Sequence, residues 1–359
     1  MLRFMTAGES HGPCLTAILE GLPAGVRVDG VRVNRELARR QEGVGRGGRM
    51  KIEQDRADFL SGLRFGETLG SPITLRITNA DWVNWEAKMA AFGEQTGPTV
   101  NAPRPGHADL TGCLKYDRQD VRDILERASA RETAARVAVG AVCRQVLEKC
   151  GIDVQSRVLS IGGAATDEEQ AEKVMAAKAA GDTLGGCFEI TATGVMPGLG
   201  SHIQWDRRLD GKIAGAVVSI PAIKGVEFGA GFECGVLPGS QVHDEIFYSE
   251  ERGVYRETNR AGGIEGGMSN GEPIVVRAVM KPIPTLTRPL ASVDLHRHAP
   301  VQANSERSDV CAVHAVACVG EAMLAIVLCG ELLAKFGGDS LSELLENIAN
   351  YREKIGERG

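Results

Sequence analysis

Ser10 and His11 lie side by side near the start of the chain, in the glycine-flanked run AGESHG. Histidine is the side chain best suited to proton transfer near neutral pH, and a neighbouring glycine lets the backbone come close to a ligand. A second histidine, His107, lies in a similar turn within the run RPGHAD. Each run alone also fits an ordinary surface turn, but the two together suggest a pair of groups for acid and base chemistry.

Five arginines between residues 35 and 49 surround a glycine-rich loop, although the whole protein carries a formal net charge of −6. Guanidinium groups match the oxygens of phosphate and carboxylate in bidentate fashion, so the loop is interpreted as an anion clamp. A solvated basic surface is the alternative. No Gly-Lys-Ser/Thr sequence follows the loop, and G-x-G-x-x-G does not occur in it between a strand and a helix, so neither common nucleotide-binding loop is indicated.

Further groups suited to anions occur at predicted helix starts, where the backbone favours negative charge. Arg127, Ser129 and Arg131 surround one such start, and Asp309 lies at another. The densest glycine cluster, residues 259–271, precedes a predicted strand. It is expected to present backbone N–H groups to a planar or phosphorylated ligand.

Hydrophobic periodicity and capping residues predict the elements that position these groups. The sequence SARE at 129–132 has the pattern of a capping box, so Ser129 is expected to open a buried helix. Asn34 and Asp339 are expected to cap two other helices. Strands are predicted at 14–22, 73–78, 188–195 and 273–280, and helices at 35–41, 129–150, 167–180, 209–217, in the stretch ending near 336, and at 340–355.

Composition limits the class of protein. A hydrophobic content of 43% and a charged content of 25% are typical of a soluble globular chain, and the acidic net charge argues against a nucleic-acid binder. Nine cysteines without a C-x-x-C pair predict no metal site and favour a reducing, cytoplasmic compartment. No signal peptide is visible. The apolar stretch 310–336 contains His314, Glu321 and Glu331, so a buried helix is expected there and not a membrane span.

Eight stretches together carry a resemblance to a known family. They are AGESHG (7–12), RRQEGVGRGGRM (39–50), RPGHAD (104–109), RASARETAARVA (127–138), GSQVHDEI (239–246), NRAGGIEGGMSNG (259–271), KPIPTL (281–286) and ERSDVCAV (306–313). With these stretches in this order, the chain resembles the chorismate synthases of the shikimate pathway.

The resemblance implies an α+β fold in which long central helices lie between antiparallel sheets, in a single domain over residues 1–359, assembled as a homotetramer. It implies a carbon–oxygen lyase that converts 5-enolpyruvylshikimate 3-phosphate to chorismate and phosphate by anti-1,4-elimination, in aromatic amino acid biosynthesis. Reduced FMN is required without net redox change. The sequence shows no added flavin-reductase segment, so NADPH or a separate flavin reductase is expected to supply the reducing equivalents.

The resemblance also implies roles for individual residues. His11 is expected to protonate the departing phosphate, His107 to protonate or tune the flavin near N1, and Asp309 to relay a proton near flavin N5. Ser10 and Ser129 would orient these groups. The arginines expected to contact substrate or NADP are Arg40, Arg46, Arg49 and Arg131. The residues expected at the flavin are Arg127, Ala128, Ser129, Pro221, Ala222, Gly266, Lys281, Pro282, Ile283, Pro284, Thr285 and Arg307.

Four positions depart from the common family pattern. Ala128 stands where serine is frequent and Pro221 where glutamine or asparagine is usual, and both flank the expected flavin site, where they could alter the affinity for FMN. Val44 replaces a frequent tyrosine and His314 a usual proline. None of the four is an expected proton-transfer residue.

Two other functions stay open from the sequence. A flavin-dependent oxidoreductase with net redox chemistry would consume reductant in proportion to product. A non-enzymatic phosphate- or RNA-binding protein would show binding that weakens steeply with salt and would tolerate replacement of either histidine.

Overall fold

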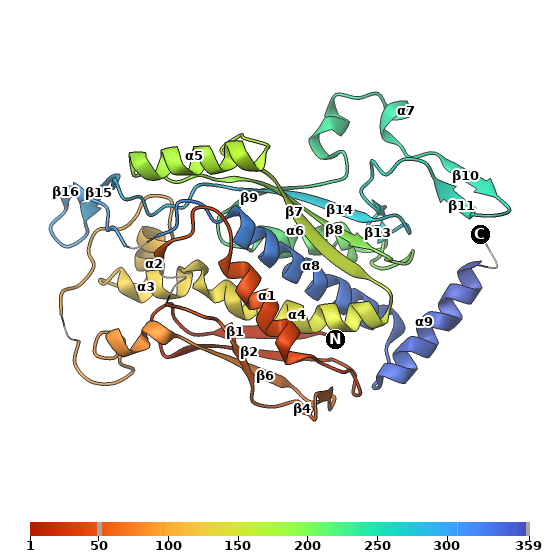
Figure 1. The fold of residues 1–359 in the computed structure, drawn as a ribbon, viewed down its shortest axis with the longest axis horizontal. Helices are drawn as coiled ribbons and strands as arrows, with labels where there is room; N and C mark the ends of the chain where they lie inside the picture. Colours follow the sequence, from red (N-terminus) through yellow and green to blue (C-terminus); the bar gives the residue numbers. More distant parts are fainter. Residues whose placement is uncertain (49–51, 96, 307, 357–359) are drawn as a thin grey trace.

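The computed structural model describes residues 1–48, 52–95, 97–306 and 308–356, and its elements form three layers (Figure 1). A four-stranded antiparallel sheet lies on each outer side. The long helices α1 (Gly30–Gln41), α4 (Thr133–Lys149) and α8 (Val313–Phe336) lie between the sheets. The predicted α+β fold with central helices between antiparallel sheets is therefore confirmed.

The first sheet has the order β1-β2-β6-β3, with β1 at Arg3–Ala7, β2 at Cys14–Glu20, β6 at Ile73–Thr78 and β3 at Ala57–Phe59. Buried and more exposed residues alternate along β2 and β6, as expected for a sheet with one face on the core. The short β1–β2 connection contains Ser10 and His11, so the pairing of these two strands places the first candidate histidine at one end of the sheet.

The second sheet has the order β7-β8-β14-β9, with β7 at Asp153–Ile161, β8 at Gly186–Thr193, β14 at Ile274–Met280 and β9 at Ile223–Phe228. Strand β14 pairs antiparallel with both β8 and β9. It ends directly before the KPIPT run, so the sheet fixes where that run begins.

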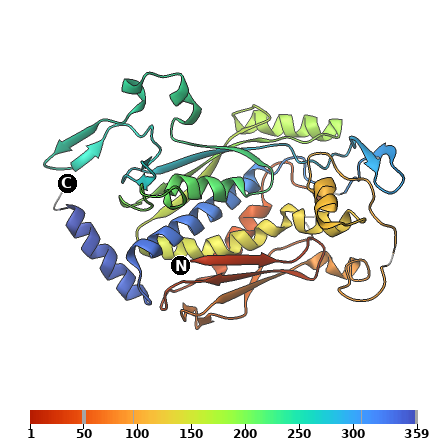
Figure 2. The ribbon, with the colours of Figure 1, turned by 180° about the vertical axis from the view of Figure 1, so that it is seen from behind.

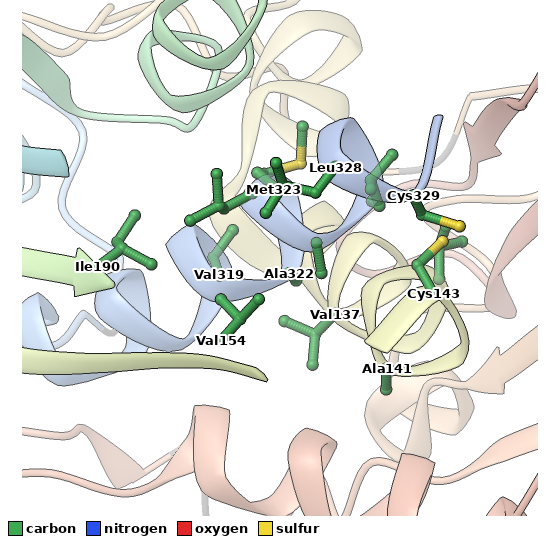
Figure 3. Close-up of a cluster of buried hydrophobic side chains, with 14 of the residues drawn as sticks. Val137, Ala141, Cys143, Val154, Ile190, Val319, Ala322, Met323, Leu328 and Cys329 are labelled. Carbon is green, nitrogen blue, oxygen red and sulfur yellow. The ribbon is translucent and has the colours of Figure 1, made fainter. Parts of the chain in front are cut away.

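The central helices α4 and α8 pack closely in the core. A Cβ atom on Gly140 of α4 would lie 2.4 Å from the Cβ of Ala322 in α8, so glycine is required at this crossing. The close packing explains why α4 contains Gly140, although a glycine inside a helix lowers stability by about 1 kcal/mol relative to alanine. Figure 3 shows Val137 near Ala322, and Cys143 beside Cys329, where the two helices meet.

Helix α8 is long and apolar enough to cross a membrane by length and composition alone. However, 78% of its most apolar window is buried inside the protein, between α4 and the second sheet. The expectation of a buried helix in this stretch is confirmed. The helix begins at Val313, so Asp309 precedes its first turn and does not lie within it.

Several helix starts differ from the predicted ones. Helix α1 begins at Gly30, because the carboxylate of Asp29 accepts the N–H of Val31 at 2.8 Å. Asn34, the predicted cap, lies inside the helix, and its side chain accepts the N–H of Ala57 at 2.9 Å. The last helix, α9 (Leu341–Gly356), is preceded by Ser340, whose hydroxyl accepts the N–H of Glu343, so Asp339 is not the cap.

The predicted capping box at Ser129 is half correct. Ser129 accepts the N–H of Arg131 at 3.3 Å, but it caps a short 3-10 turn, Ala130–Glu132, that precedes α4. The carboxylate of Glu132 bonds to Thr6 and Arg136 and does not return to Ser129.

Other predictions of single elements hold. The capping box at Thr166 opens α5 (Asp167–Ala180), and α6 occupies Leu209–Val218. The remaining α-helices and strands of the described residues are α2 (Asp109–Tyr116), α3 (Arg122–Ala128), α7 (Gly239–Val242), β4 (Leu63–Arg64), β5 (Glu67–Thr68), β10 (Ile246–Ser249), β11 (Gly253–Arg256), β12 (Ile264–Glu265), β13 (Met268–Ser269), β15 (Ala291–Asp294) and β16 (Ala299–Gln302). The arm of α7, β10 and β11 projects from the layers at the end where α9 lies (Figure 2).

Candidate active site

A cavity of about 530 Å³ lies where several distant parts of the chain meet. Its wall comprises the β1–β2 connection, the RPGHAD turn, the residues between α3 and α4, the KPIPT run after β14, and the segment before α8. The fold thus brings together most of the stretches whose residue types suggested chemistry, although they are spread over about 300 residues of sequence.

The β1–β2 connection is held rigidly in the wall of this cavity. Gly8 has a φ of +108°, and a Cβ there would lie 2.4 Å from the carbonyl oxygen of Cys14, so only glycine fits. The side-chain amide of Asn79 donates to the carbonyl oxygens of Glu9, at 3.2 Å, and Gly12, at 2.7 Å. His11 between them is 8% exposed.

The imidazole of His11 is held by a buried carboxylate. Its Nδ1 lies 3.0 Å from Oε1 and 2.9 Å from Oε2 of Glu126, and the backbone N–H of His11 donates to Oε2 at 2.9 Å. The side chain of Glu126 is 1% exposed. Burial acts to raise the pKa of Glu126, but the hydrogen bonds and charge of His11 and a bond from Arg122 outweigh it, so this pKa lies below its ordinary value.

An indole and a guanidinium complete the surroundings of His11. The ring of Trp85 stacks on the imidazole with a centroid distance of 3.9 Å and an interplanar angle of 21°. Arg122 lies over the same indole at 4.9 Å and donates to Glu126 Oε1 at 2.7 Å. One ring nitrogen and one face of the imidazole are therefore fixed by the protein.

His107 is held differently, inside a compact ion network. Its Nδ1 contacts Asp109 Oδ1, and Arg104 Nη2 lies 3.1 Å from the same nitrogen. Arg104 also donates from Nε to Asp109 Oδ2 at 2.8 Å and from Nη1 to Thr285 Oγ1 at 2.9 Å. Burial acts to raise the pKa of Asp109, but hydrogen bonds from His107 and Arg104 hold it well below its usual range.

Arg40 and Arg131 form a buried cationic pair at the cavity around one shared carboxylate. Arg40 Nη2 donates to Asp55 Oδ2 at 2.8 Å, and Arg131 Nη1 donates to the same oxygen at 2.7 Å. Arg131 Nε also donates to Asn79 Oδ1 at 3.0 Å. Within the described residues, Arg40 Nε and Arg131 Nη2 are buried without a hydrogen-bond partner. Burial lowers the pKa of Arg131, against the attraction of Asp55.

The glycine-rich loop after α1 meets the segment before α8 through Asp309. Arg46 Nη1 donates to Asp309 Oδ2 at 2.6 Å, and the backbone N–H of Gly47 donates to Oδ1 at 2.5 Å. A Cβ on Gly47 would lie 2.9 Å from the carbonyl oxygen of Ser308, so the glycine permits this approach. Burial lowers the pKa of Arg46, and Asp309 opposes that shift.

Comparison with known proteins agrees with this geometry. A family model described as "Chorismate synthase" matches residues 2–333. A protein named "Chorismate synthase" from Sulfurihydrogenibium sp. (strain YO3AOP1) is 56% identical, with 99% of each chain covered. Another of that name, from Aquifex aeolicus (strain VF5), is 54% identical, with 98% of this chain and 97% of the other covered. The chain belongs to the chorismate synthase family. A solved structure titled "Crystal Structure of Chorismate Synthase" has a TM-score of 0.80 at 45% identity and covers 99% of this chain and 98% of its own.

Most residues to which the chorismate synthase resemblance gave a role line the cavity. They are Ser10, His11, Arg40, Arg46, His107, Ala128, Ser129, Arg131, Pro221, Ala222, Lys281, Ile283, Pro284, Thr285 and Asp309. Arg127 does not line it, since its guanidinium donates to the carbonyl oxygens of Thr6 and Gly8. Pro282 and Gly266 are also absent from the wall. Arg49 and Arg307 lie outside the described residues, and all these flavin or substrate roles stay predictions.

Part of the glycine cluster at 259–271 hydrogen-bonds to the protein itself. Gly266 and Gly267, both with positive φ, turn the β12–β13 hairpin. Asp244 accepts the N–H groups of Arg260 and Ala261, and the side chain of Asn259 accepts that of Gly263. These donors are satisfied by the chain itself, so they are not available to a ligand in this arrangement.

Two short segments form the expected flavin side of the cavity, one at residues 221–222 and one at residues 281–285, and the backbone of the first is constrained. Ala222 has a φ of +73°, a conformation that costs a non-glycine residue of order 1–3 kcal/mol and that concentrates at functional sites. Its carbonyl oxygen accepts the N–H of Lys281 at 2.9 Å, which ties the two predicted flavin segments together. Among the described residues, no group of three or more histidine, cysteine, aspartate or glutamate side chains could hold a metal ion.

Sequence reasoning missed several residues that support the chorismate synthase cavity. Glu126 follows Arg122 by four residues, which indicates only an ordinary helical ion pair. Trp85 had no assigned place, and nothing near Asp55 or Asn79 suggested contact with Arg131 in the 3-10 turn before α4. Arg104 and Asp109 were visible in the RPGHAD run, but no role was predicted for them.

Proposed function

We propose that this protein converts 5-enolpyruvylshikimate 3-phosphate to chorismate and phosphate, with reduced FMN and no net redox change. The observation that carries the proposal is the combination, in one cavity, of two histidines held by buried carboxylates with buried arginines that retain unpaired donors. Membership of the chorismate synthase family supports the same reaction.

The charges of the cavity suit the proposed substrate, which carries a phosphate and two carboxylates. Arg40 and Arg131 each have a buried nitrogen without a hydrogen bond to the described residues, and a buried unpaired donor is costly unless a ligand satisfies it. Arg46 and Lys281 also line the cavity. Asp55 and Glu53 pair with Arg131 but leave the buried nitrogens of Arg40 and Arg131 without a hydrogen bond within the described residues. An anion bound among these side chains could accept hydrogen bonds from both.

The elimination breaks the C–O bond to phosphate and a C–H bond and forms a carbon–carbon double bond. His11 protonates an oxygen of the departing phosphate, and Ser10 and Ser129 orient the reacting groups. When bound, reduced FMN supplies transient electron density to the substrate and takes part in removing the hydrogen. The cavity residues that would hold it are Ala128, Ser129, Pro221, Ala222, Lys281, Ile283, Pro284 and Thr285.

His107 and Asp309 would control protons on the flavin side. His107 lies beside Gly106, whose carbonyl oxygen accepts from the ammonium of Lys281, so the second histidine is tied to the expected flavin segment. Asp309 accepts two hydrogen bonds from the arginine loop, which fixes the carboxylate while leaving it in the cavity wall. A proton moved by either group would remain within the cavity.

The wider setting is also proposed from the family. We expect a cytoplasmic homotetramer that obtains reduced FMN through NADPH or a separate flavin reductase. Assembly is supported by large apolar side chains that are exposed on the arm and its neighbourhood, namely Phe232, Val236, Ile246, Tyr248 and Val254. Such exposure is common where another subunit binds.

An anaerobic assay tests the proposed reaction. Protein, reduced FMN and 5-enolpyruvylshikimate 3-phosphate are mixed without oxygen, and chorismate absorbance and phosphate release are followed together. The two products should appear in equal amounts, with many turnovers for each reduced flavin. Product formed in proportion to reductant consumed would instead indicate net redox chemistry. Phosphate or RNA binding that weakens steeply with salt, without chorismate, would indicate a binding protein.

A further inference from the structure

The carboxylate behind His11 has no assigned role, yet it makes three contacts with that one residue. We propose that Glu126 is a positioning residue, which keeps the Nδ1 proton of His11 in place so that only Nε2 gains and loses a proton, at the cavity. The role of this proton in the elimination rests on the proposed function. The placement of the proton on the ring does not.

The first step of the argument is the direction of the hydrogen bonds. An ionised carboxylate only accepts, so Nδ1, at 2.9 Å from Oε2 and 3.0 Å from Oε1, must carry a hydrogen. The backbone N–H of His11 donates to Oε2 as well, which orients the carboxylate toward the ring. In a neutral imidazole the other nitrogen is then the one with the lone pair.

The second step is that Nε2 faces the cavity. Across the described ranges of the chain, Nε2 makes no hydrogen bond, and it is not among the buried unpaired atoms, while His11 itself lines the cavity. The proton balance follows directly. The Nε2–H bond of the imidazolium breaks, an O–H bond forms on the leaving phosphate, and neutral His11 keeps its Nδ1–H on Glu126.

The third step is what keeps Glu126 ionised through this exchange. Arg122 donates to Oε1 at 2.7 Å and is anchored on its other side by Glu306 at 3.1 Å. The guanidinium therefore bonds to the carboxylate, and among the described residues no hydrogen bond joins it to the imidazole. Trp85 covers one face of the ring, so the ring cannot rotate to exchange its nitrogens without losing the stack.

The chain offers a matched pair of variants for the test. Glu126→Gln keeps the size of the side chain but removes its charge, and its amide can donate to Nδ1. Glu132→Gln is the control, because Glu132 is also buried and pairs with an arginine four residues away, Arg136, but it touches no histidine and does not line the cavity. Flavin binding and thermal unfolding of both variants report the folded fraction.

Turnover of the folded fraction gives the first readout. Glu126→Gln is expected to lower kcat by roughly 100-fold or more, within the range for a general acid, with KM changed less than about threefold. Glu132→Gln is expected to stay within about threefold of the wild type. Equal kcat values in the two variants would overturn the proposal. If Glu126→Gln does not fold, Glu126→Asp replaces it, and full wild-type kcat in that variant would be the contrary result.

The second readout does not need turnover. Nitrogen NMR of the wild-type protein labelled with ¹⁵N-histidine, with His11 assigned by loss of its signals in His11→Gln, shows which ring nitrogen is protonated. Neutral His11 is expected to carry its hydrogen on Nδ1, and Glu126→Gln to mix the two forms. A hydrogen on Nε2 in the neutral wild type would overturn the inference. Failure of the wild type to form chorismate would instead overturn the proposed function and leave this readout intact.

Discussion

The cavity contains two histidine centres built from the same residue types in different arrangements. At His11 the carboxylate of Glu126 lies between the imidazole and the guanidinium of Arg122. At His107 the guanidinium of Arg104 lies beside the ring, 3.1 Å from the nitrogen that also contacts Asp109. In the first centre the cation hydrogen-bonds to carboxylates, whereas in the second it lies within hydrogen-bond distance of the ring nitrogen itself. The difference favours His11 as the proton donor to an anionic leaving group.

The two centres also differ in how firmly each is tied to the rest of the protein. Arg104 is 8% exposed. It donates hydrogen bonds to Asp109 and Thr285, and it also contacts the ring of His107. The side chain of Arg122 is 18% exposed and bonds to two glutamates. The cation of the second centre is therefore packed in the interior, and the cation of the first centre is more exposed.

The largest effect is expected from His11→Ala, which removes the proposed proton donor. Turnover should fall by about two to four orders of magnitude, while FMN still binds, because no flavin contact is removed. The anaerobic assay measures turnover and flavin fluorescence measures binding. His243→Ala is the control, since His243 is exposed and lies outside the cavity wall. Near-normal turnover in His11→Ala would remove the functional difference between the centres.

A smaller effect, on stability, is expected from Arg104→Ala compared with Arg122→Ala. Removal of Arg104 leaves the fully buried Asp109 without its main cation, which should cost about 3–5 kcal/mol of unfolding free energy. Removal of Arg122 should cost about 1–3 kcal/mol, because Glu126 keeps its bonds to His11. Urea unfolding with a check of constant slope measures both. Equal losses of unfolding free energy would show that the two arginines stabilise the fold equally, and the expected difference between the centres would be wrong.

The comparison also explains what the sequence could and could not predict. Arg104, His107 and Asp109 lie within six residues, so one short motif contains the whole second centre apart from Thr285. His11 and Glu126 are 115 residues apart, and only the packing of α3 against the β1–β2 connection brings them together. A sequence pattern reports neighbours along the chain, so His11 was predicted together with Ser10 but its carboxylate partner Glu126 was missed.

The same distinction applies to the fold. Long elements such as α8 and β14 were predicted within a few residues, because α8 is a continuous apolar stretch and burial alternates along β14. The predicted start of α1 was wrong, because the side chain of Asn34 does not cap the helix. It accepts a hydrogen bond from the N–H of Ala57, which is distant in the sequence. The layered topology came from the family resemblance and not from periodicity, since strand order depends on pairs such as β8 with β14, which are far apart in sequence.

The smallest expected effect is a difference in the pH dependence of stability between Asp109→Asn and the wild type. Burial raises the pKa of Asp109, but bonds from His107 and Arg104 outweigh it and hold the pKa well below its unfolded value of about 3.9. A lowered pKa adds stability that is complete above the unfolded value and is lost as pH falls below it toward the folded value. Urea unfolding between pH 3 and pH 7 should therefore show the two proteins converging below about pH 4, by at most about 1.4 kcal/mol per pH unit. Glu126→Gln should converge in the same direction over a narrower range, because that pKa is lowered less strongly. Parallel curves for Asp109→Asn and the wild type would mean that the ion network at His107 does not hold its carboxylate charged, and the contrast between the two centres would fail.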